Sequence, residues 1–150
     1  MISVEQAFDR IVGGASPLQT EKVAVEMASG RVIASPIAAR RSQPGTALSA
    51  MDGYAVLSSS LNGKNVSLNV IGESAAGHPF SGSVREGEAV RIFTGAAVPP
   101  GSDQVIIQEN VARDGNVIVT QELAKPQNNI RAKGCDFDER QVVLDAGTFM

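Results

Sequence analysis

The stretch that organises this sequence is a mostly apolar segment with one carboxylate at its corner, Ser49-Ala50-Met51-Asp52-Gly53-Tyr54-Ala55-Val56. An Asp-Gly pair between apolar segments is a common turn signal, because glycine accepts positive φ and the aspartate side chain bonds nearby amides. The same pair would also display a carboxylate at a loop tip, where it could bind a metal ion through oxygen or act on a proton. Spacing alone leaves the structural and the functional interpretation of Asp52 open.

A second corner follows further along the chain, at Arg91-Ile92-Phe93-Thr94-Gly95-Ala96, and is closed by Pro99-Pro100-Gly101. A Thr-Gly step after a strand presents backbone N–H groups and a hydroxyl, which suit an oxyanion such as phosphate. An ordinary side chain-to-backbone turn explains the same residues. We interpret the two corners as half of an active site whose other half lies outside this chain.

Length and composition set the broad class. The 150 residues are 43% hydrophobic, which is enough for a packed core in one chain of ordinary domain size. A net charge of -3 gives no electrostatic reason to expect nucleic acid or an anionic membrane as partner. The sequence has no apolar run of transmembrane length and no secretory signal at its start, and its single cysteine, Cys135, cannot form an internal disulfide. These features favour a cytoplasmic protein.

Short apolar runs between turn-forming residues predict a mainly β protein with a few N-terminal helices, an α+β fold. Ser3 and Gln6 fit a capping box that starts a helix over residues 4–12, and residues 26–34 are a weaker helix candidate because Gly30 lies inside them. Alternation of apolar and polar residues predicts a half-buried strand over residues 66–70. Further strands are expected at residues 20–25, 37–39, 89–93 and 105–108, with a hairpin at Asp114-Gly115.

Other polar features carry weaker functional signals. Gly72, Gly77 and Gly82 recur every five residues without a P-loop or dinucleotide-binding pattern, which is more typical of a flexible or sharply bent surface loop. His78 is the only histidine and has no second ligand residue beside it. The cations Arg131 and Lys133 near Cys135 are opposed by neighbouring aspartates, so a bland cysteine, at the surface or half-buried, is expected.

Read as whole motifs, the two corners resemble the N-terminal region of the molybdopterin molybdenumtransferase family, which includes MoeA and the gephyrin E domain. Residues 49–56 resemble the family pattern S-x-M-D-G-Y-A-V, and residues 91–103 resemble R-I-x-T-G-A-x-x-P-x-G-x-D. Glu109 falls where the family has a strand-end glutamate, and residues 129–136 resemble N-x-R-x-x-G-x-D. Several motifs in the correct order over nearly the whole chain make the resemblance specific.

The resemblance implies a reaction and a set of site residues. Enzymes of this family insert molybdate into adenylylated molybdopterin and release AMP, with a divalent cation such as Mg²⁺. It implies that Asp52 is the key acidic group, that Thr94 is its polar partner, and that Asp52 is also the candidate Mg²⁺ ligand. The residues expected to bind substrate are Ser49, Gly53, Tyr54, Gly95, Asp103 and Glu109.

The resemblance also implies an architecture. We expect an elongated homodimer with bent and coiled β-sheets, in which the small-molecule site lies between the β-rich domain of one subunit and the pterin-binding domain of the other. Residues 1–42 with 124–150 would form one discontinuous domain around an inserted β-rich domain at 43–123. The pterin-binding and C-terminal domains of the family are absent from this sequence, which agrees with an N-terminal part that is inactive alone.

Three departures from the family pattern bear on the substrate contacts. Cys135 replaces a common acidic residue, Glu139-Arg140 stands where Gly-Asp is usual, and Gly45-Thr46-Ala47-Leu48 replaces an aromatic-acid-amide run. Two alternatives stay open beside the transferase. One is a dimerisation or partner-binding module that kept the fold without the chemistry. The other is an unrelated sugar- or nucleotide-binding β module, which rests only on the glycine-rich loop.

Overall fold

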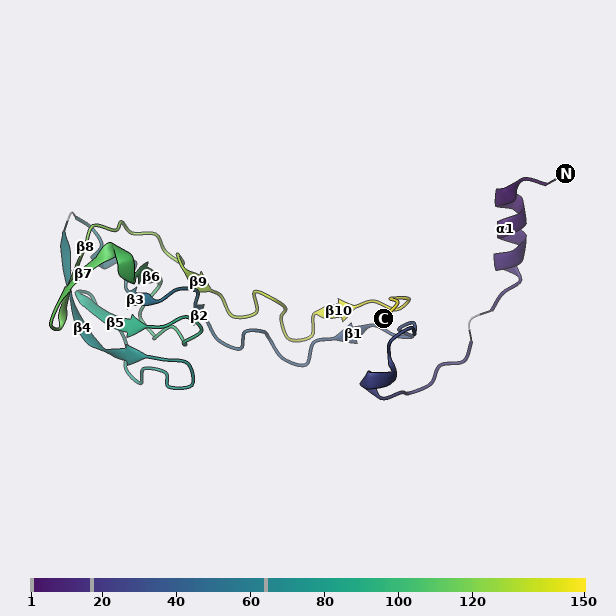
Figure 1. Cartoon of the computed structure of the whole chain (residues 1–150), viewed down its shortest axis with the longest axis horizontal. Helices are drawn as coiled ribbons and strands as arrows, with labels where there is room; N and C mark the ends of the chain where they lie inside the picture. The colour runs from purple at the N-terminus through teal and green to yellow at the C-terminus, as the bar shows by residue number, and fades with distance from the viewer. Residues whose placement is uncertain (1, 17, 64) are drawn as a thin grey trace. The chain divides into compact units, whose positions relative to one another are not determined.

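The computed structural model describes residues 2–16, 18–63 and 65–150, and it is mainly β (Figure 1). The chain packs as two compact units. One comprises the residues up to Ile37 together with Leu144–Met150, and the other is Ala38–Val143. The family resemblance instead implies a domain division near residues 43 and 124. The packing of the chain does not test that division, which stays a prediction.

The first unit contains the one α-helix of the described residues, α1 (Val4–Gly13). The predicted capping box is confirmed: the Ser3 hydroxyl accepts from the Gln6 amide and the Gln6 side chain accepts from the Ser3 amide, each at 3.2 Å. No residue of α1 is buried, and Phe8 and Ile11 are 64% and 75% exposed. The helix therefore has an apolar face without a partner among the described residues.

Two expectations for this unit are wrong. Residues 20–24 form no strand, and in place of a helix over 26–34 there is a single 3-10 turn, η1 (Val25–Met27). Gly30 adopts φ +76°, in the left-handed region that a continuing α-helix does not allow. Backbone hydrogen bonds instead tie residues 30–33 to residues 147–150, including Gly30 N to Met150 O at 2.8 Å.

Two small sheets of two strands each lie outside the main sheet. The strand expected at 37–39 is confirmed as β1 (Ile37–Ala38), which pairs with β10 (Val142–Leu144). Strand β2 (Leu48–Ser49) pairs antiparallel with β9 (Ile130–Arg131). The β2–β9 pair brings Ser49, at the start of the first corner, beside the segment that resembles the third family motif.

A six-stranded sheet forms the body of the second unit, in the order β6-β3-β5-β4-β8-β7. Only β4 and β5 run parallel to each other; the other neighbours are antiparallel. The expected strands and the Asp114-Gly115 hairpin are confirmed. The strands are β3 (Gly53–Val56), β4 (Val66–Ser74), β5 (Glu88–Ile92), β6 (Gln104–Ile107), β7 (Val111–Asp114) and β8 (Val117–Thr120).

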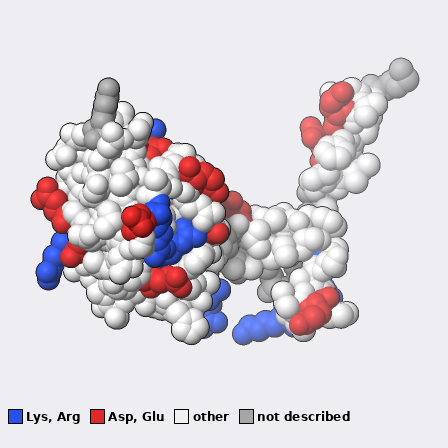
Figure 2. Space-filling view, turned by 60° about the vertical axis from the view of Figure 1, so that its left-hand side comes forward, with Lys and Arg blue, Asp and Glu red and all other residues white. Residues whose placement is uncertain are grey.

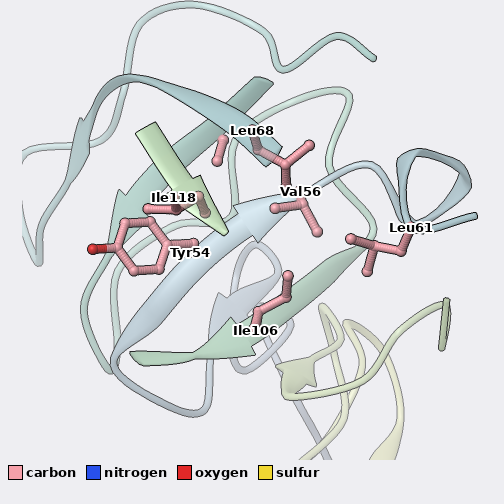
Figure 3. Packing of buried hydrophobic residues seen from close by; sticks show 7 residues of the cluster. Tyr54, Val56, Leu61, Leu68, Ile106 and Ile118 are labelled. Atoms are coloured by element: carbon pink, nitrogen blue, oxygen red, sulfur yellow. The ribbon is translucent and has the colours of Figure 1, made fainter. Parts of the chain in front are cut away.

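The sheet is buried on both of its faces near β3. Tyr54 and Val56 point into one cluster with Leu61, Leu68, Ala89, Ile106 and Ile118 (Figure 3). Ala55, between them in the chain, packs on the other side with Ile92, Ala96 and Val105. Side chains alternate across a strand, so continuous burial of β3 requires packing on both faces. This makes β3 a rigid base for the corner that precedes it.

The glycine-rich loop has a structural explanation. A side chain at Gly72 or Gly82 would collide with the Phe80 ring, and Gly77 takes φ +78° in the tight turn closed by Ala75 and His78. The glycines therefore make room for an aromatic ring and a turn. The sharply bent loop expected from the sequence is confirmed.

Charge is mixed over the surface. Figure 2 shows Lys and Arg interspersed with Asp and Glu on the visible face of the molecule. Among the described residues, no helix has the length and apolar character needed to span a lipid bilayer.

Candidate functional site

The two corners meet at Asp52 and Thr94. One carboxylate oxygen of Asp52, Oδ1, accepts from the Thr94 amide and from the Thr94 hydroxyl, each at 2.8 Å. Asp52 lies directly before β3, and Thr94 lies just beyond the end of β5. Because β3 and β5 are antiparallel with Gly53 opposite Ile92, the start of one strand lies beside the end of the other. The sheet register therefore builds the contact.

Ser49 and Gly95 join the same corners through the backbone. The Gly95 amide donates to Ser49 O, and the Ser49 amide donates to Ala96 O, both at 2.9 Å. The buried Ser49 hydroxyl donates to Met51 O at 2.6 Å and so shapes the bend that leads to Asp52. Gly95 adopts φ +80°, which explains glycine at that position.

The Thr94 and Gly95 donors, which were expected to suit an oxyanion, bond to other protein groups in the structure. The Thr94 amide and hydroxyl bond to Asp52, and the Gly95 amide bonds to Ser49. These donors therefore form hydrogen bonds between the two corners and hold them together. Substrate binding by Ser49 and Gly95 stays a prediction, and it would have to use groups other than these amides.

Gly53 is explained by close approach and not by the positive φ that the Asp-Gly signal suggested. Its φ is not in the left-handed region, but a Cβ there would overlap the carbonyl oxygen of Ile106 in the neighbouring strand β6. The Gly53 carbonyl accepts from Arg91 Nη1 at 3.1 Å. Its expected role in substrate binding is not tested by this geometry.

The carboxylate of Asp52 is held in its ionised form. The bonds from the Thr94 amide and then from its hydroxyl lower the pKa of Asp52 below its ordinary value, and the charge of Arg91 acts in the same direction. Partial desolvation opposes these effects and is weaker than the hydrogen bonds. Within the described part of the chain, no group donates to the second oxygen, Oδ2. An ionised carboxylate with one unused oxygen is suited to accept from a ligand or to bind a cation.

Tyr54 lies in strand β3, directly after the corner, and its side chain is part of the core. Its side chain is only 5% exposed and belongs to the core cluster, although Figure 3 shows its hydroxyl pointing away from the other labelled residues. The guanidinium of Arg91 lies over the Tyr54 ring at 5.3 Å and over the Phe93 ring at 4.7 Å. Tyr54 therefore supports Arg91, and a direct contact between Tyr54 and substrate stays a prediction.

Asp103 is placed away from the corner. Its two carboxylate oxygens accept from the Ser58 amide at 2.6 Å and the Ser58 hydroxyl at 2.7 Å. These bonds fix the start of the 3-10 turn η2 (Ser58–Ser60). Antiparallel β6 places Asp103 beside Val56, at the far end of β3 from Asp52. The structure therefore explains Asp103 as a structural residue, and its expected role as a substrate ligand has no support from its position.

Glu109 lies close to the corner but apart from the Asp52–Thr94 contact. It belongs to the 3-10 turn η3 (Gln108–Asn110), whose first amide, Gln108 N, donates to Asp52 O at 3.1 Å. Glu109 is exposed and lines a shallow hollow of about 620 Å³ together with Asn65, Val111 and Glu122. A smaller hollow of about 220 Å³ is lined by Met51, by residues 105–107, and by Lys125, Asn128 and Asn129 on its other side. Substrate binding by Glu109 stays a prediction.

The described residues do not form a complete metal site by themselves. In the described residues, no three His, Cys, Asp or Glu side chains come together as ligands. At the corner, Asp52 Oδ2 is a charged oxygen that accepts no hydrogen bond from the described residues. Mg²⁺ commonly keeps several waters and takes one or two carboxylates with substrate phosphates, so a single aspartate fits that kind of site.

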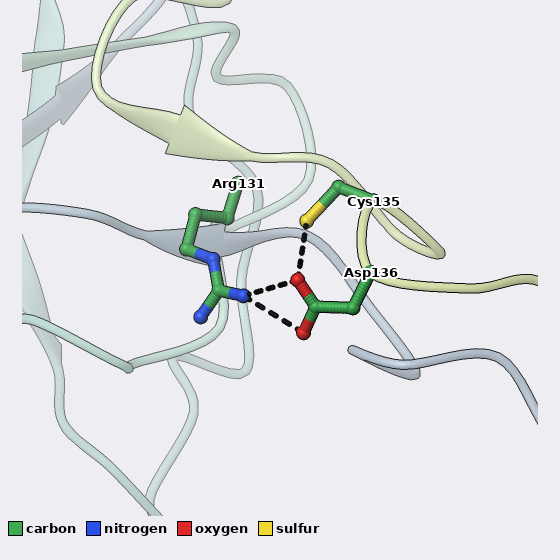
Figure 4. A network of polar contacts seen from close by, with 3 residues as sticks. All are labelled: Arg131, Cys135 and Asp136. Carbon is green, nitrogen blue, oxygen red and sulfur yellow. Dashed lines mark hydrogen bonds and ion pairs between the residues drawn. The ribbon is translucent and has the colours of Figure 1, made fainter. Parts of the chain in front are cut away.

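The third motif forms a separate polar cluster (Figure 4). Arg131 Nη2 donates to both carboxylate oxygens of Asp136, at 2.7 and 2.9 Å, and this ion pair raises the pKa of Arg131. The Sγ of Cys135 lies 3.7 Å from Asp136, and Cys135 is exposed, in agreement with the bland surface or half-buried cysteine that was expected. Arg140, one of the departures from the family pattern, adopts φ +68°, in the left-handed region that residues other than glycine adopt uncommonly.

Two residues of the site were not singled out from the sequence. Arg91 bonds to Gly53 O and, through Nη2, to Gln108 Oε1 at 2.6 Å, while Gln108 bonds to Asp52 O through its amide. A cation within the otherwise apolar run of residues 89–93 was the available signal for Arg91. No such signal was available for Gln108, because its position beside Asp52 depends on how β3 pairs with β6.

Fold and site together define a β-rich module that displays an ionised carboxylate where two strand corners meet. The chain belongs to the MoeA N-terminal region (domain I and II) family, whose model matches residues 2–150. The mainly β fold and the family resemblance expected from the sequence are thereby confirmed, with one α-helix in the described residues instead of a few.

Named relatives agree with this assignment. The chain is 40% identical over 149 residues to a molybdopterin molybdenumtransferase of Haemophilus influenzae, covering 98% of this chain and 37% of that protein. It is 35% identical over 137 residues to one of Nostoc sp., covering 89% of this chain and 31% of that protein. The crystal structure of a molybdopterin biosynthesis moeA protein from Pyrococcus horikoshii OT3 superposes with a TM-score of 0.81 at 34% identity, over 87% of this chain and 35% of that one. The chain thus spans about a third of the length of these relatives.

Proposed function

We propose that this chain is the N-terminal part of a molybdopterin molybdenumtransferase, which inserts molybdate into adenylylated molybdopterin and releases AMP during molybdenum cofactor biosynthesis. The relatives named above carry that enzyme name, and the chain matches them over almost all of its own length. The observation that carries the proposal for this chain is the Asp52–Thr94 contact, which joins the two motifs that distinguish the family.

Asp52 would act as an anionic ligand more than as a base. A general base works best with a pKa near the operating pH, and the bonds from Thr94 move the pKa of Asp52 away from that range. A carboxylate whose pKa is lowered is suited instead to bind a cation, or to accept a hydrogen bond from the water that accompanies molybdate. Thr94 would position Asp52, since its amide and hydroxyl both bond to the carboxylate.

Asp52 is the residue of this chain that would hold Mg²⁺, through its unused oxygen. When bound, the cation would offset negative charge on the phosphate and molybdate oxygens. The remaining ligands would come from water, from the substrate or from a pterin-binding domain. Because the described residues bring no cluster of three ligand side chains together, the proposal includes a homodimer in which the partner subunit's pterin-binding domain completes the site. A cytoplasmic location is part of the same proposal.

The experiment uses a chimera in which residues 2–150 replace the matching region of the Haemophilus influenzae relative. Asp52→Asn keeps the shape of the side chain and removes its charge, so molybdate insertion should fall by about a hundredfold or more. Asp114→Asn, at the tip of the β7–β8 hairpin, is the matched control and should leave the rate unchanged. A rate for Asp52→Asn within a factor of three of the unsubstituted chimera would refute the role of Asp52.

A second candidate is a dimerisation or partner-binding module of the same fold without chemistry. The observation in its favour is the exposed apolar face of α1, where Val4 is 82% and Ile11 is 75% exposed. It predicts that the chimera associates as the relative does but inserts no molybdate. A chimera with molybdate insertion above background would exclude this candidate.

A further inference from the structure

We propose that Arg91 is a positioning residue that, together with Gln108, holds the two successive backbone carbonyls of Asp52 and Gly53 in a clamp. This proposal rests on the function proposed above for Asp52. Two sets of contacts would then align the Asp52 carboxylate: Thr94 holds the side chain, and Arg91 with Gln108 holds the main chain.

The clamp is a closed ring of polar contacts. Arg91 Nη1 donates to Gly53 O at 3.1 Å, and Arg91 Nη2 donates to Gln108 Oε1 at 2.6 Å. The Gln108 amide donates to Asp52 O at 3.1 Å. Two successive carbonyls, those of Asp52 and Gly53, are therefore held by two residues that also hold each other. Thr94 holds the carboxylate itself, so the main-chain and side-chain supports are independent.

Arg91 is well placed for a fixed role. It lies directly opposite Tyr54 in the β3–β5 register, and its guanidinium lies over the Tyr54 and Phe93 rings, at 5.3 and 4.7 Å. Stacking on two rings restrains the guanidinium plane, and the planar fork directs its two nitrogens to two acceptors at once. Among the described residues, no carboxylate forms an ion pair with Arg91. The hydrogen bonds and the rings, and not an acidic partner, fix its place.

Lysine should not replace Arg91, because an ammonium group lacks the fork needed to reach both acceptors in a fixed geometry. Arg113 provides a matched control within the same unit. Its Nε donates to a backbone carbonyl, Gly115 O, at 2.9 Å, but it lies in the β7–β8 hairpin and contacts neither corner. Arg113→Lys thus removes an arginine–carbonyl bond away from the site.

The first measurement is hydrogen exchange of the Gln108 amide, the group that bonds to Asp52 O, in the chimera described above. Arg91→Lys should speed this exchange by about tenfold, as expected for loss of a hydrogen bond to a charged group. Exchange at Ile118, in the interior strand β8, should stay unchanged and so exclude general unfolding. Arg113→Lys should change neither. Unchanged exchange at Gln108 in Arg91→Lys would overturn the clamp, as would equal acceleration at Gln108 and Ile118.

The second measurement separates positioning from binding. In Arg91→Lys, kcat for molybdate insertion should fall by about tenfold while the KM for molybdate changes less than threefold, because the charge remains and the alignment is lost. A raised KM with unchanged kcat would overturn the positioning role. Gln108→Ala opens the ring from an exposed side chain and should give the same pattern more weakly. The two proposals fail separately: an active Asp52→Asn variant would end the function proposed for Asp52, whereas the exchange result would still decide the clamp.

Discussion

Thr94 donates two hydrogen bonds to one oxygen of Asp52, although the two residues are 42 positions apart in the chain. The amide bond is fixed by the backbone, and the hydroxyl bond depends on the side chain. Together they are the largest cause of the lowered pKa of Asp52. The pair therefore couples the geometry of the corner to the charge of its carboxylate.

Thr94→Val should raise the pKa of Asp52 toward its ordinary value, because it removes the hydroxyl donor and keeps the shape and the amide. The rise should be partial, since the amide bond is the larger cause and remains. The carbon chemical shift of the Asp52 carboxyl, followed by NMR against pH, measures it. Thr94→Ser, which keeps the hydroxyl, should titrate as the unsubstituted protein does, and equal midpoints for Val and Thr at this position would contradict the assignment.

Gly53→Ala should destabilise the second unit. The added Cβ would overlap Ile106 O, so β3 and β6 would have to separate at a position that is fully paired. Overpacking of this kind costs about 1–3 kcal/mol, measured as the free energy of unfolding in urea. Gly45→Ala is the control, because a Cβ at Gly45 meets nothing within 4 Å. Equal stability of the two variants would show that the strands can separate at no cost.

Asp103→Ala tests whether Asp103 is structural or binds substrate. Loss of the acceptor for the Ser58 amide and hydroxyl should lower the free energy of unfolding by about 1–3 kcal/mol. The KM of the folded chimera for molybdate should stay the same, because Asp103 lies at the far end of β3 from Asp52. A higher KM with full stability would restore the role in substrate binding that the sequence motif implied.

Local signals in the sequence predicted much of the fold. The capping box of α1, the alternation in β4 and the Asp-Gly turn of the β7–β8 hairpin each depend on residues close together in the chain, and each is confirmed. The strand and helix expected at residues 20–34 are wrong. A glycine with positive φ and backbone bonds to the distant residues 147–150 decide the conformation there.

The candidate site was also predicted only in part, because contacts between residues far apart in the chain decide which groups come together. Motif resemblance singled out Asp52 and Thr94, and the structure brings them into contact. The resemblance also named Asp103 as a residue expected to bind substrate; the antiparallel register of β3 and β6 places Asp103 at the far end of β3 from Asp52, and its role in binding stays a prediction. Arg91 and Gln108 were missed because their partners are backbone carbonyls, and only the pairing of three strands shows which carbonyls they reach.

Gln104 anchors the segment that follows the sheet to its edge strand. The side chain is fully buried; its Nε2 donates to Leu123 O at 3.1 Å and its Oε1 accepts from the Lys125 amide at 2.6 Å. The same segment continues to Asn129, whose carbonyl accepts from the amide of Ala50, two residues before Asp52. The anchor therefore supports one wall of the hollow beside the corner.

Gln104→Leu should leave Leu123 O and the Lys125 amide without their partner, at a cost of about 1–3 kcal/mol for each buried group that water does not reach. Faster hydrogen exchange of the Lys125 amide and a lower free energy of unfolding are the expected results. The control is Gln121→Leu, which removes an exposed contact to Asn65 and should have little effect. If the two variants unfold at the same urea concentration, the segment is held by its backbone bonds alone, including Val105 N to Asn128 O.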